Sequence, residues 1–421
     1  MADTVIRDSS VELMPPEGSL MAFVAGFFLA TRIVLVFLAV RVLGADARTG
    51  AEASLALGFL LLIVVGFHSL GDAKRSFGSM LRLPSIRWVM LFLAVSCCSL
   101  AWSRTVSLPS SIVFWCGMAA DVAIVVLLLR AGSVVGRARS LMKGFVIGAC
   151  CIALIAWIMP AQADLRLGDE DFFNTNQIGN LCAFAFFWAQ YLMRRKEGKW
   201  GWAALFMALT LLRSLSKTTL VAFVLSQSFL VIQDRSLSRR TKILLTTAVM
   251  LIVVIFWGLF EAYYDIYTTA GNQAETLTGR TAIWLYVADE SVQSPWIGHG
   301  FDSMWKVVPP FGSDAFEARH AENEVLQQFY AYGVGGVVML VGLYWSLYAT
   351  IRKRSRAPVK IVFVSMLLFI VIRGLAEAEP FDLLLPLWAI VLISLLVDAE
   401  ETMTEENTAV YSQQLPQHAA S

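Results

Sequence analysis

Long apolar runs recur along most of this chain, and they constrain its fold more than any other feature. A helical run of about 17 to 23 apolar residues is long enough to cross the hydrocarbon core of a bilayer. Hydrophobic residues make up 57% of the 421 positions and charged residues only 15%, whereas roughly a quarter of a soluble domain is charged. The sequence therefore predicts an all-α, polytopic membrane protein. The net charge of +1 gives no indication of nucleic-acid binding.

We predict about twelve transmembrane helices, separated by one long loop into a first group within residues 20–261 and a second within 326–398. The expected spans are 20–42, 52–70, 88–102, 111–129, 143–160, 177–193, 199–213, 217–233, 242–261, 326–350, 360–374 and 383–398. Residues 1–19 lack the basic start of a cleavable signal peptide, so the first span is expected to direct insertion. Residues 399–421 are acidic and then Gln/Ser-rich, which predicts a disordered tail.

Basic residues alternate between successive loops. The loops after the second, fourth, sixth, eighth and tenth spans are rich in Lys and Arg, and the loops between them carry few. Cytoplasmic loops of membrane proteins carry this excess of positive charge. The basic loops, the N-terminal tail and the C-terminal tail are therefore predicted to be cytoplasmic.

The predicted spans contain few charged or reactive side chains. Arg32 and Asp121 lie deep in the first and fourth spans, where charges are costly and often paired, so we expect them to pair with each other. All six cysteines fall inside apolar segments. Thiols in such places are ordinarily inert, so we expect neither disulfides nor a cysteine metal site.

One connection on the outer face differs from the others. Residues 262–325 form a loop of 64 residues that contains Trp284, Trp296 and Trp305. This segment is too apolar for a flexible linker, and long loops with structure of their own usually have a function.

Five outer-face connections, one of them the long loop 262–325, carry cations, carboxylates and amides. Each one alone is ordinary, because outer loops are polar and cations near span ends extend their charge to water. Together they stand on the face where basic residues are otherwise sparse, and arginines kept there indicate an anionic ligand. The residues are Trp102-Ser103-Arg104; Arg166, Asn176 and Asn180; Arg213, Ser216, Lys217 and Thr218; Arg280; His320, Glu322 and Asn323; Arg373, Glu377 and Glu379.

These stretches resemble the O-antigen ligase and polymerase superfamily of bacterial cell-surface polysaccharide assembly. TGRTAIW followed by SPWIGHGFDSMW is similar to the long-loop pattern "GR…W…P…G.G" of that family. Asn323, followed by Gly333 and Gly336, fits its His-Asn motif with a trailing G-x-x-G. WSRTVSLPSS, FFNTNQIGN and SLSKTTLVAF match weaker blocks in the same order. The resemblance covers about residues 90–395 and is strongest to exopolysaccharide polymerases of the succinoglycan type.

The chain departs from the family pattern at two places. Glu322 precedes Asn323 where the family usually has histidine, and His320 lies two positions earlier. Lys217 stands where the family usually has arginine between serine and threonine. Lysine keeps the charge but loses the planar fork of arginine, so its contact with phosphate should be less directional.

The resemblance implies a GT-C-like fold in the bacterial inner membrane and a glycosyl transfer on its periplasmic face. The donor would be an oligosaccharide linked to undecaprenyl pyrophosphate, and the acceptor a saccharide hydroxyl. A polymerase of repeat units is favoured; a ligase would transfer finished glycan to lipid A core or to protein. A transporter or flippase of lipid-linked sugars is the third hypothesis, but we see no internal repeats or mid-membrane binding groups typical of one. The implied partners are the donor, the bilayer, a chain-length regulator and export machinery, with no cofactor.

The outer cations are the candidates for binding the pyrophosphate. Arg280 matches the loop arginine of the family and has the fork that suits phosphate oxygens. Lys217 is the second candidate, followed by Arg213 and Arg166, with Asn176 in support. Positioned cations can replace the electrostatic role of magnesium.

We predict metal independence, because no Asp-x-Asp motif is present. The acidic run Asp169, Glu170 and Asp171 is expected to be a solvated loop rather than a metal site.

The base that takes the acceptor proton has two candidates, with Asn323 supporting either. Register in the family motif favours Glu322, and the ordinary pKa of histidine, about 6.5, favours His320. If this segment is helical, positions two apart point roughly 200° away from each other, so only one side chain could face the sugar. Gly333, Gly335 and Gly336 are expected to allow close packing of the following span.

Overall fold

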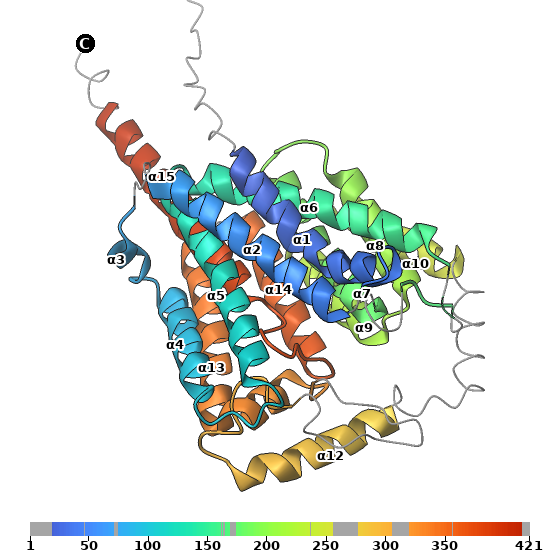
Figure 1. The fold of residues 1–421 in the computed structure, drawn as a ribbon. Coiled ribbons are helices and arrows are strands. Elements are labelled where there is room, and N and C mark those ends of the chain that lie inside the picture. Colours follow the sequence, from blue (N-terminus) through green and yellow to red (C-terminus); the bar gives the residue numbers. More distant parts are fainter. Residues whose placement is uncertain are drawn as a thin grey trace, which may run out of the picture.

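The computed structural model describes residues 19–45, 47–70, 75–160, 162, 165–168, 174–235, 237–255, 277–304, 320–355 and 357–414. Helices without any strand make up the regular structure of these segments, and most of them pack side by side in one bundle (Figure 1). The helices are α1 (Leu20–Arg41), α2 (Ala47–Leu70), α3 (Phe77–Met80), α4 (Pro84–Ser99), α5 (Leu108–Arg130), α6 (Val134–Ile158), α7 (Thr175–Arg194), α8 (Gly201–Ser214), α9 (Lys217–Gln233), α10 (Arg239–Ile255), α12 (Leu277–Gln293), α13 (Glu324–Arg354), α14 (Ala357–Gly374) and α15 (Leu387–Gln414).

Each predicted span coincides with a helix, except that residues 256–261 of one span lie outside the described residues. Among the described residues, four helices are long and apolar enough to cross a membrane, or five if the two parts of α1 count as one span. The four are Thr49–Ser69, Leu108–Arg130, Val134–Ile158 and Glu324–Arg354. The chain is therefore a multi-pass membrane protein, and the number of twelve crossings stays a prediction.

The disordered tail expected from residue 399 onward is wrong for residues 399–414, because α15 continues without a break to Gln414. Acidic side chains at this point pair with arginines from other parts of the chain. The pairs are Asp398 with Arg75 and Arg354, Glu400 with Arg139 and Arg195, and Glu401 with Arg354. The acidic composition that predicted a solvated tail instead supplies counter-charges for the basic loops.

Glycines bring α1 and α6 into backbone contact. A Cβ at Gly144 would overlap the carbonyl oxygen of Phe23, and a Cβ at Gly26 would overlap that of Leu141. Small residues allow such close approach between membrane helices, where packing rather than the hydrophobic effect drives association. This crossing fixes α6 against the first span.

Gly144→Ala is expected to destabilise the protein by about 1–3 kcal/mol, because the added methyl group must push the two backbones apart. The matched control is Gly66→Ala on α2, since no atom lies within 4 Å of a Cβ built there. Thermal unfolding in one detergent measures both variants. Equal melting temperatures for the two would contradict the close crossing.

The predicted partnership of Arg32 and Asp121 is confirmed, since the two side chains form an ion pair between α1 and α5. All six cysteines have free thiols.

Part of the long outer loop is a helix, α12, which lies crosswise below α4 and α13 in Figure 1. Trp305 and much of the remaining loop lie outside the described residues.

The segment after α12 packs against α13 at Gly333, whose φ of +62° interrupts the helix. There the N–H of Val334 donates to the carbonyl of Pro295 at 2.7 Å. Gly333 is needed for this contact because a Cβ would lie 2.5 Å from the Pro295 oxygen. The glycine therefore admits a loop backbone, where we expected a neighbouring helix.

Sequence blocks far apart in the chain meet around this loop. Ser103 donates its hydroxyl to the carbonyl of Phe301 at 2.5 Å, and the N–H of Arg104 donates to the carbonyl of His299 at 2.9 Å. Similarly, the Ser216 hydroxyl donates to Asn176 Oδ1 at 2.7 Å. The loops after α4, α6, α8, α12 and α14 therefore pack at one end of the bundle.

Candidate active site

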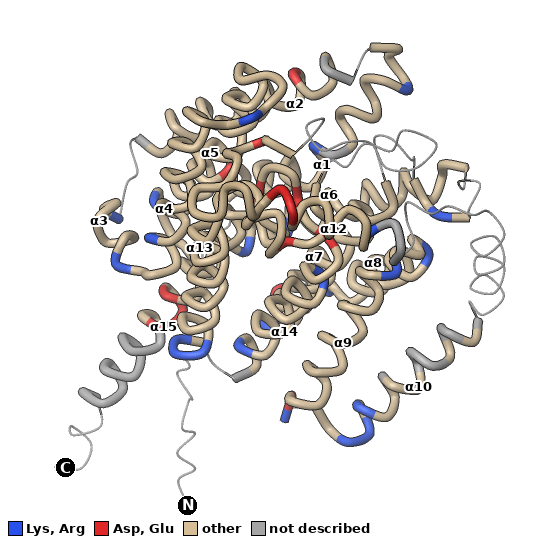
Figure 2. The backbone as a smooth tube through the Cα atoms, turned by 90° about the horizontal axis from the view of Figure 1, so that it is seen from below, with Lys and Arg blue, Asp and Glu red and all other residues tan. Residues whose placement is uncertain are grey.

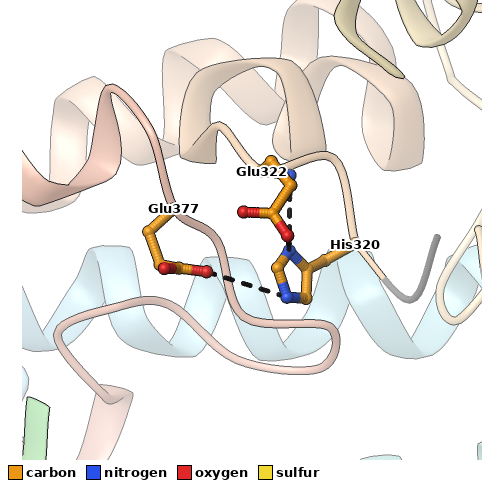
Figure 3. Close-up of side chains that lie close together, drawn as sticks. All are labelled: His320, Glu322 and Glu377. Carbon is orange, nitrogen blue, oxygen red and sulfur yellow. Dashed lines mark hydrogen bonds and ion pairs between the residues drawn. The ribbon is translucent and has the colours of Figure 1, made fainter. Parts of the chain in front are cut away.

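A histidine and two glutamates lie together at the end of the bundle where α13 begins (Figure 3). His320 Nδ1 is 3.8 Å from Glu322 Oε1, and His320 Nε2 is 3.8 Å from Glu377 Oε1. Glu377 is buried, with 4% of its side chain exposed, while His320 and Glu322 are partly exposed. Viewed from the α12 end, Figure 2 shows acidic segments near the middle of the bundle and basic segments mostly toward its rim.

Arg280 of α12 holds the two carboxylates. Its Nη2 lies 3.3 Å from Glu322 Oε2 and 4.0 Å from Glu377 Oε2. Its Nη1 donates to the Thr218 hydroxyl at 3.1 Å and to the Ala376 carbonyl at 2.6 Å. The guanidinium is thus tied to the start of α9 and to the loop after α14.

A second arginine approaches from α14. Arg373 is 1% exposed, and its Nη2 lies 3.9 Å from Glu377 Oε2. Its Nε donates to the Thr219 hydroxyl at 3.3 Å. We call Arg280, His320, Glu322, Arg373 and Glu377 the outer cluster. Its two guanidiniums balance its two carboxylates, so the set is formally neutral while His320 is neutral.

The local backbone explains why His320 and Glu322 face each other. Helix α13 begins only at Glu324, and Asn323 is its N-cap, with Oδ1 accepting from the N–H of Leu326 at 3.0 Å. Glu322 has φ of +51°, a left-handed conformation that is uncommon for a side chain of this size. His320 and Glu322 would point away from each other only if this segment were helical. Since it is not helical, the two side chains can face each other.

Two further contacts fix this strained turn. The indole N–H of Trp284 donates to the Glu322 carbonyl at 3.1 Å, and the Asn323 amide donates to the Leu375 carbonyl at 2.9 Å. Asn323 therefore supports the site by joining the start of α13 to the loop that carries Glu377. Unusual backbone conformations persist where surrounding contacts hold them, and they concentrate at functional sites.

The other predicted residues divide into two groups. Lys217 is exposed at the first position of α9, next to Thr218, which contacts Arg280. Asn176 accepts from Ser216, the residue before Lys217, so it supports the same turn.

The hydrogen bond from Arg213 to Leu165 lies outside the outer cluster. The Arg213 guanidinium donates to the carbonyl of Leu165, and Arg166 is buried in the same short segment. The arrangement assigns Arg213 to shaping the loop after α6. Asp169, Glu170 and Asp171 lie outside the described residues.

Burial lowers the pKa of His320 below its ordinary value of 6.5. The charges of Glu377 and Glu379 oppose this shift, and those of Arg373 and Arg280 add to it. The imidazole is therefore neutral at neutral pH and has a lone pair to offer. Neutral histidine is the form that can accept a proton.

His320, Glu322 and Glu377 also offer a nitrogen and carboxylate oxygens within 4.8 Å of one another, as metal ligands would. Glu322 and Glu377 already face Arg280, and Glu377 also faces Arg373. Two guanidiniums beside the carboxylates disfavour a divalent cation, so these residues fit a metal poorly.

Sequence reasoning recognised Arg373 and Glu377 as polar residues of the outer face but did not assign them to the site. Their spacing of four on α14 and its following turn, with Arg373 1% exposed, makes them a buried ion pair. The signal that could have identified them is the run RGLAEAEP, which places three charges at the end of an otherwise apolar segment.

Comparison with known proteins agrees with this geometry. Residues 202–341 match the family model described as O-antigen ligase, which covers a third of the chain and includes Lys217, Arg280, His320 and Glu322. No curated protein matches the chain. Residues 202–341 are therefore similar to O-antigen ligases, which supports the resemblance of the chain to the O-antigen ligase and polymerase superfamily.

Proposed function

We propose that the protein is a polymerase of exopolysaccharide repeat units that uses an undecaprenyl-pyrophosphate-linked oligosaccharide as donor. The observation that carries the proposal is the outer cluster, in which a neutral histidine, two carboxylates and two arginines meet. Arg280, His320 and Glu322 of this cluster lie in the segment that matches the O-antigen ligase model. The resemblance to succinoglycan-type polymerases favours a growing saccharide as acceptor.

The proposed topology places this chemistry on the periplasmic face of the bacterial inner membrane. Twelve spans would leave both termini in the cytoplasm, with residues 262–325 as the periplasmic loop. The basic loops support this orientation, because they lie on the opposite side of the twelve spans from the outer cluster. A chain-length regulator and export machinery would act with such a polymerase.

In the proposed reaction, an acceptor hydroxyl attacks the anomeric carbon of the donor sugar. The bond between that carbon and the phosphate oxygen breaks, and undecaprenyl pyrophosphate leaves with the bonding electrons. Arg280 and Lys217 stabilise the charge that develops on this leaving group. The acceptor proton passes to a base and then to water.

We assign the proton transfer to His320. The N–H of Glu322 donates to His320 Nδ1 at 3.3 Å, so this nitrogen carries the lone pair and Nε2 carries the proton. Nε2 faces the buried Glu377 at 3.8 Å, which orients the ring. An acceptor hydroxyl that replaces the Glu322 N–H at the Nδ1 lone pair would also reach Glu322 Oε1, which lies 3.8 Å from Nδ1. Catalytic contacts that are long in the free enzyme tighten when substrate binds.

Glu322 links donor binding to this step. Its Oε2 faces Arg280, and a pyrophosphate that takes over the guanidinium would release the carboxylate toward the acceptor. In this proposal Glu322 orients the acceptor hydroxyl, and metal ions take no part because the arginines balance the leaving charge.

A ligase remains the alternative, favoured by the description of the matching family model. Deleting the gene and analysing lipid-linked intermediates distinguishes the functions. A polymerase leaves single repeats on the lipid, whereas a ligase leaves long chains on it. Repeats retained on the cytoplasmic leaflet would show a flippase instead and would exclude both transferases.

Glu377→Gln is expected to move the acidic limb of the pH–rate profile to lower pH and to reduce kcat. The carboxylate raises the pKa of His320, so its removal lowers that pKa further, and activity then persists to more acidic pH. The charged groups facing His320 are Glu322, Glu377, Glu379, Arg280 and Arg373. The control is Glu401→Gln, which removes an ion-paired carboxylate from α15. If Glu377→Gln lowers the melting temperature but leaves the acidic limb of the pH–rate profile where it is, Glu377 has only a structural role.

A further inference from the structure

The first turn of α9 lies between the two arginines of the outer cluster. Arg280 donates to the hydroxyl of Thr218, and Arg373 donates to the hydroxyl of Thr219. Lys217 is the first residue of this 17-residue helix. Three cations therefore surround one helix N-terminus, where partial positive charge and N–H groups favour anions.

The serine that precedes the helix does not cap it. Ser216 makes no side-chain hydrogen bond to the first-turn N–H groups; its hydroxyl donates instead to Asn176 Oδ1 at 2.7 Å and to Thr219 Oγ1 at 2.8 Å. The first N–H groups of a helix have no partner inside it. Ser216 thus leaves the N–H groups of Thr218 and Thr219 without a side-chain cap.

Arg373 supplies an independent sign of a ligand. Its Nη1 is buried and has no hydrogen-bond partner, although the residue is only 1% exposed. The other terminal nitrogen, Nη2, lies 3.9 Å from Glu377 Oε2, which is beyond hydrogen-bond distance. A buried guanidinium with an unused donor is costly unless an anion or water completes it. Arg280 and Thr218, at the same end of α9, are partly exposed.

We propose that Arg373 and the first turn of α9 form the inner half of a diphosphate site, with Arg280 and Lys217 as its outer half. This inference rests on the proposed function, because it assigns the site to the leaving group of the donor. One phosphate lies against Arg373 and the N-terminus of α9, and the other lies against Arg280. Filling the site gives Arg373 Nη1 the partner that it lacks and draws Arg280 away from Glu322.

The alternative is a structural arginine that only balances the charge of Glu377. Both roles predict that Arg373→Ala destabilises the protein, so that variant cannot separate them. Arg373→Lys keeps the charge next to Glu377 and removes the fork, which only a directional contact with phosphate requires. Thr219→Val is a second variant, since it removes the hydroxyl that orients Arg373 without changing any charge.

The test measures binding of inorganic pyrophosphate to the full-length protein in detergent by calorimetry, after thermal unfolding has shown that each variant is folded. Arg373→Lys is expected to weaken binding by about 10-fold or more, because a charged hydrogen bond contributes roughly 1.5–3 kcal/mol. Thr219→Val is expected to weaken it in the same direction. The matched control is Arg137→Lys, since Arg137 is also buried but donates to the Leu128 carbonyl between α5 and α6.

Equal affinity of wild type and both variants would overturn the site, as would wild-type protein that does not bind pyrophosphate. Binding that depends on Arg373 in a protein that transfers no glycan would support the site and reject the proposed function. Active polymerisation with affinity independent of Arg373 and Thr219 would support the function and reject the site.

Discussion

Arg280→Ala is expected to reduce glycan transfer by at least about 10²–10³-fold, the usual loss when a positioned donor to developing charge is removed. The guanidinium is the one group in the outer cluster that contacts Glu322, Glu377, the start of α9 and the loop after α14 together. Its loss would remove stabilisation of the leaving pyrophosphate. Product formation by membranes containing equal amounts of each variant measures the effect.

Arg280→Lys separates charge from geometry. Lysine can neutralise Glu322 and Glu377 but cannot donate in parallel to two phosphate oxygens, so we expect intermediate activity with near-normal stability. The control is Arg213→Lys, because Arg213 donates to the Leu165 carbonyl rather than to the outer cluster. Full activity of Arg280→Ala would remove Arg280 from the catalytic site.

His320→Asn is expected to lower kcat by about 10²–10⁴-fold, the range that general base catalysis contributes. Glu322→Gln should lower kcat less, because in our account it orients the acceptor rather than taking its proton. The amide of asparagine can occupy the same place but cannot accept a proton, so protein abundance and melting temperature should change little. Rates at saturating donor, measured over a range of pH, compare the two variants.

The reverse order of effects would assign the proton to Glu322. An acidic limb of the pH–rate profile that His320→Asn leaves unchanged would point the same way, because that limb could not then come from protonation of His320. The two profiles together settle the alternative that the sequence left open.

The helical segments were predictable because each is a separate run of apolar residues with its own boundaries. The pairing of Arg32 with Asp121 was predictable for a similar reason, since an isolated charge inside a membrane needs a counter-charge. Contacts between residues far apart in the sequence cannot be predicted from hydrophobic periodicity. The helix from residue 399 to 414 was missed because its charge partners lie elsewhere in the sequence.

The sequence identified the loops that form the candidate site but only some of the residues in it. Arg280, His320 and Glu322 were identified, and the structure brings them together. Arg373 and Glu377 were not assigned, because their role depends on α14 ending beside α9 and α13, which local sequence does not encode. The contact of Arg213 with the Leu165 carbonyl becomes visible only in the fold, and its role in binding pyrophosphate stays a prediction.

The mutual orientation of His320 and Glu322 also required the structure. Their spacing of two would separate them in a helix, but the left-handed backbone of Glu322 turns the chain just before Asn323 caps α13. Such a conformation is uncommon for glutamate, so sequence alone predicts the opposite. Contacts from Trp284 hold the turn in place.

The most direct test uses the purified protein in liposomes with an undecaprenyl-pyrophosphate-linked repeat unit and EDTA. Our account predicts that saccharide chains grow, that one undecaprenyl pyrophosphate is released for each repeat joined, and that Arg280→Ala stops both. Donor that stays intact beside folded protein, or chain growth that requires a divalent cation, would contradict it.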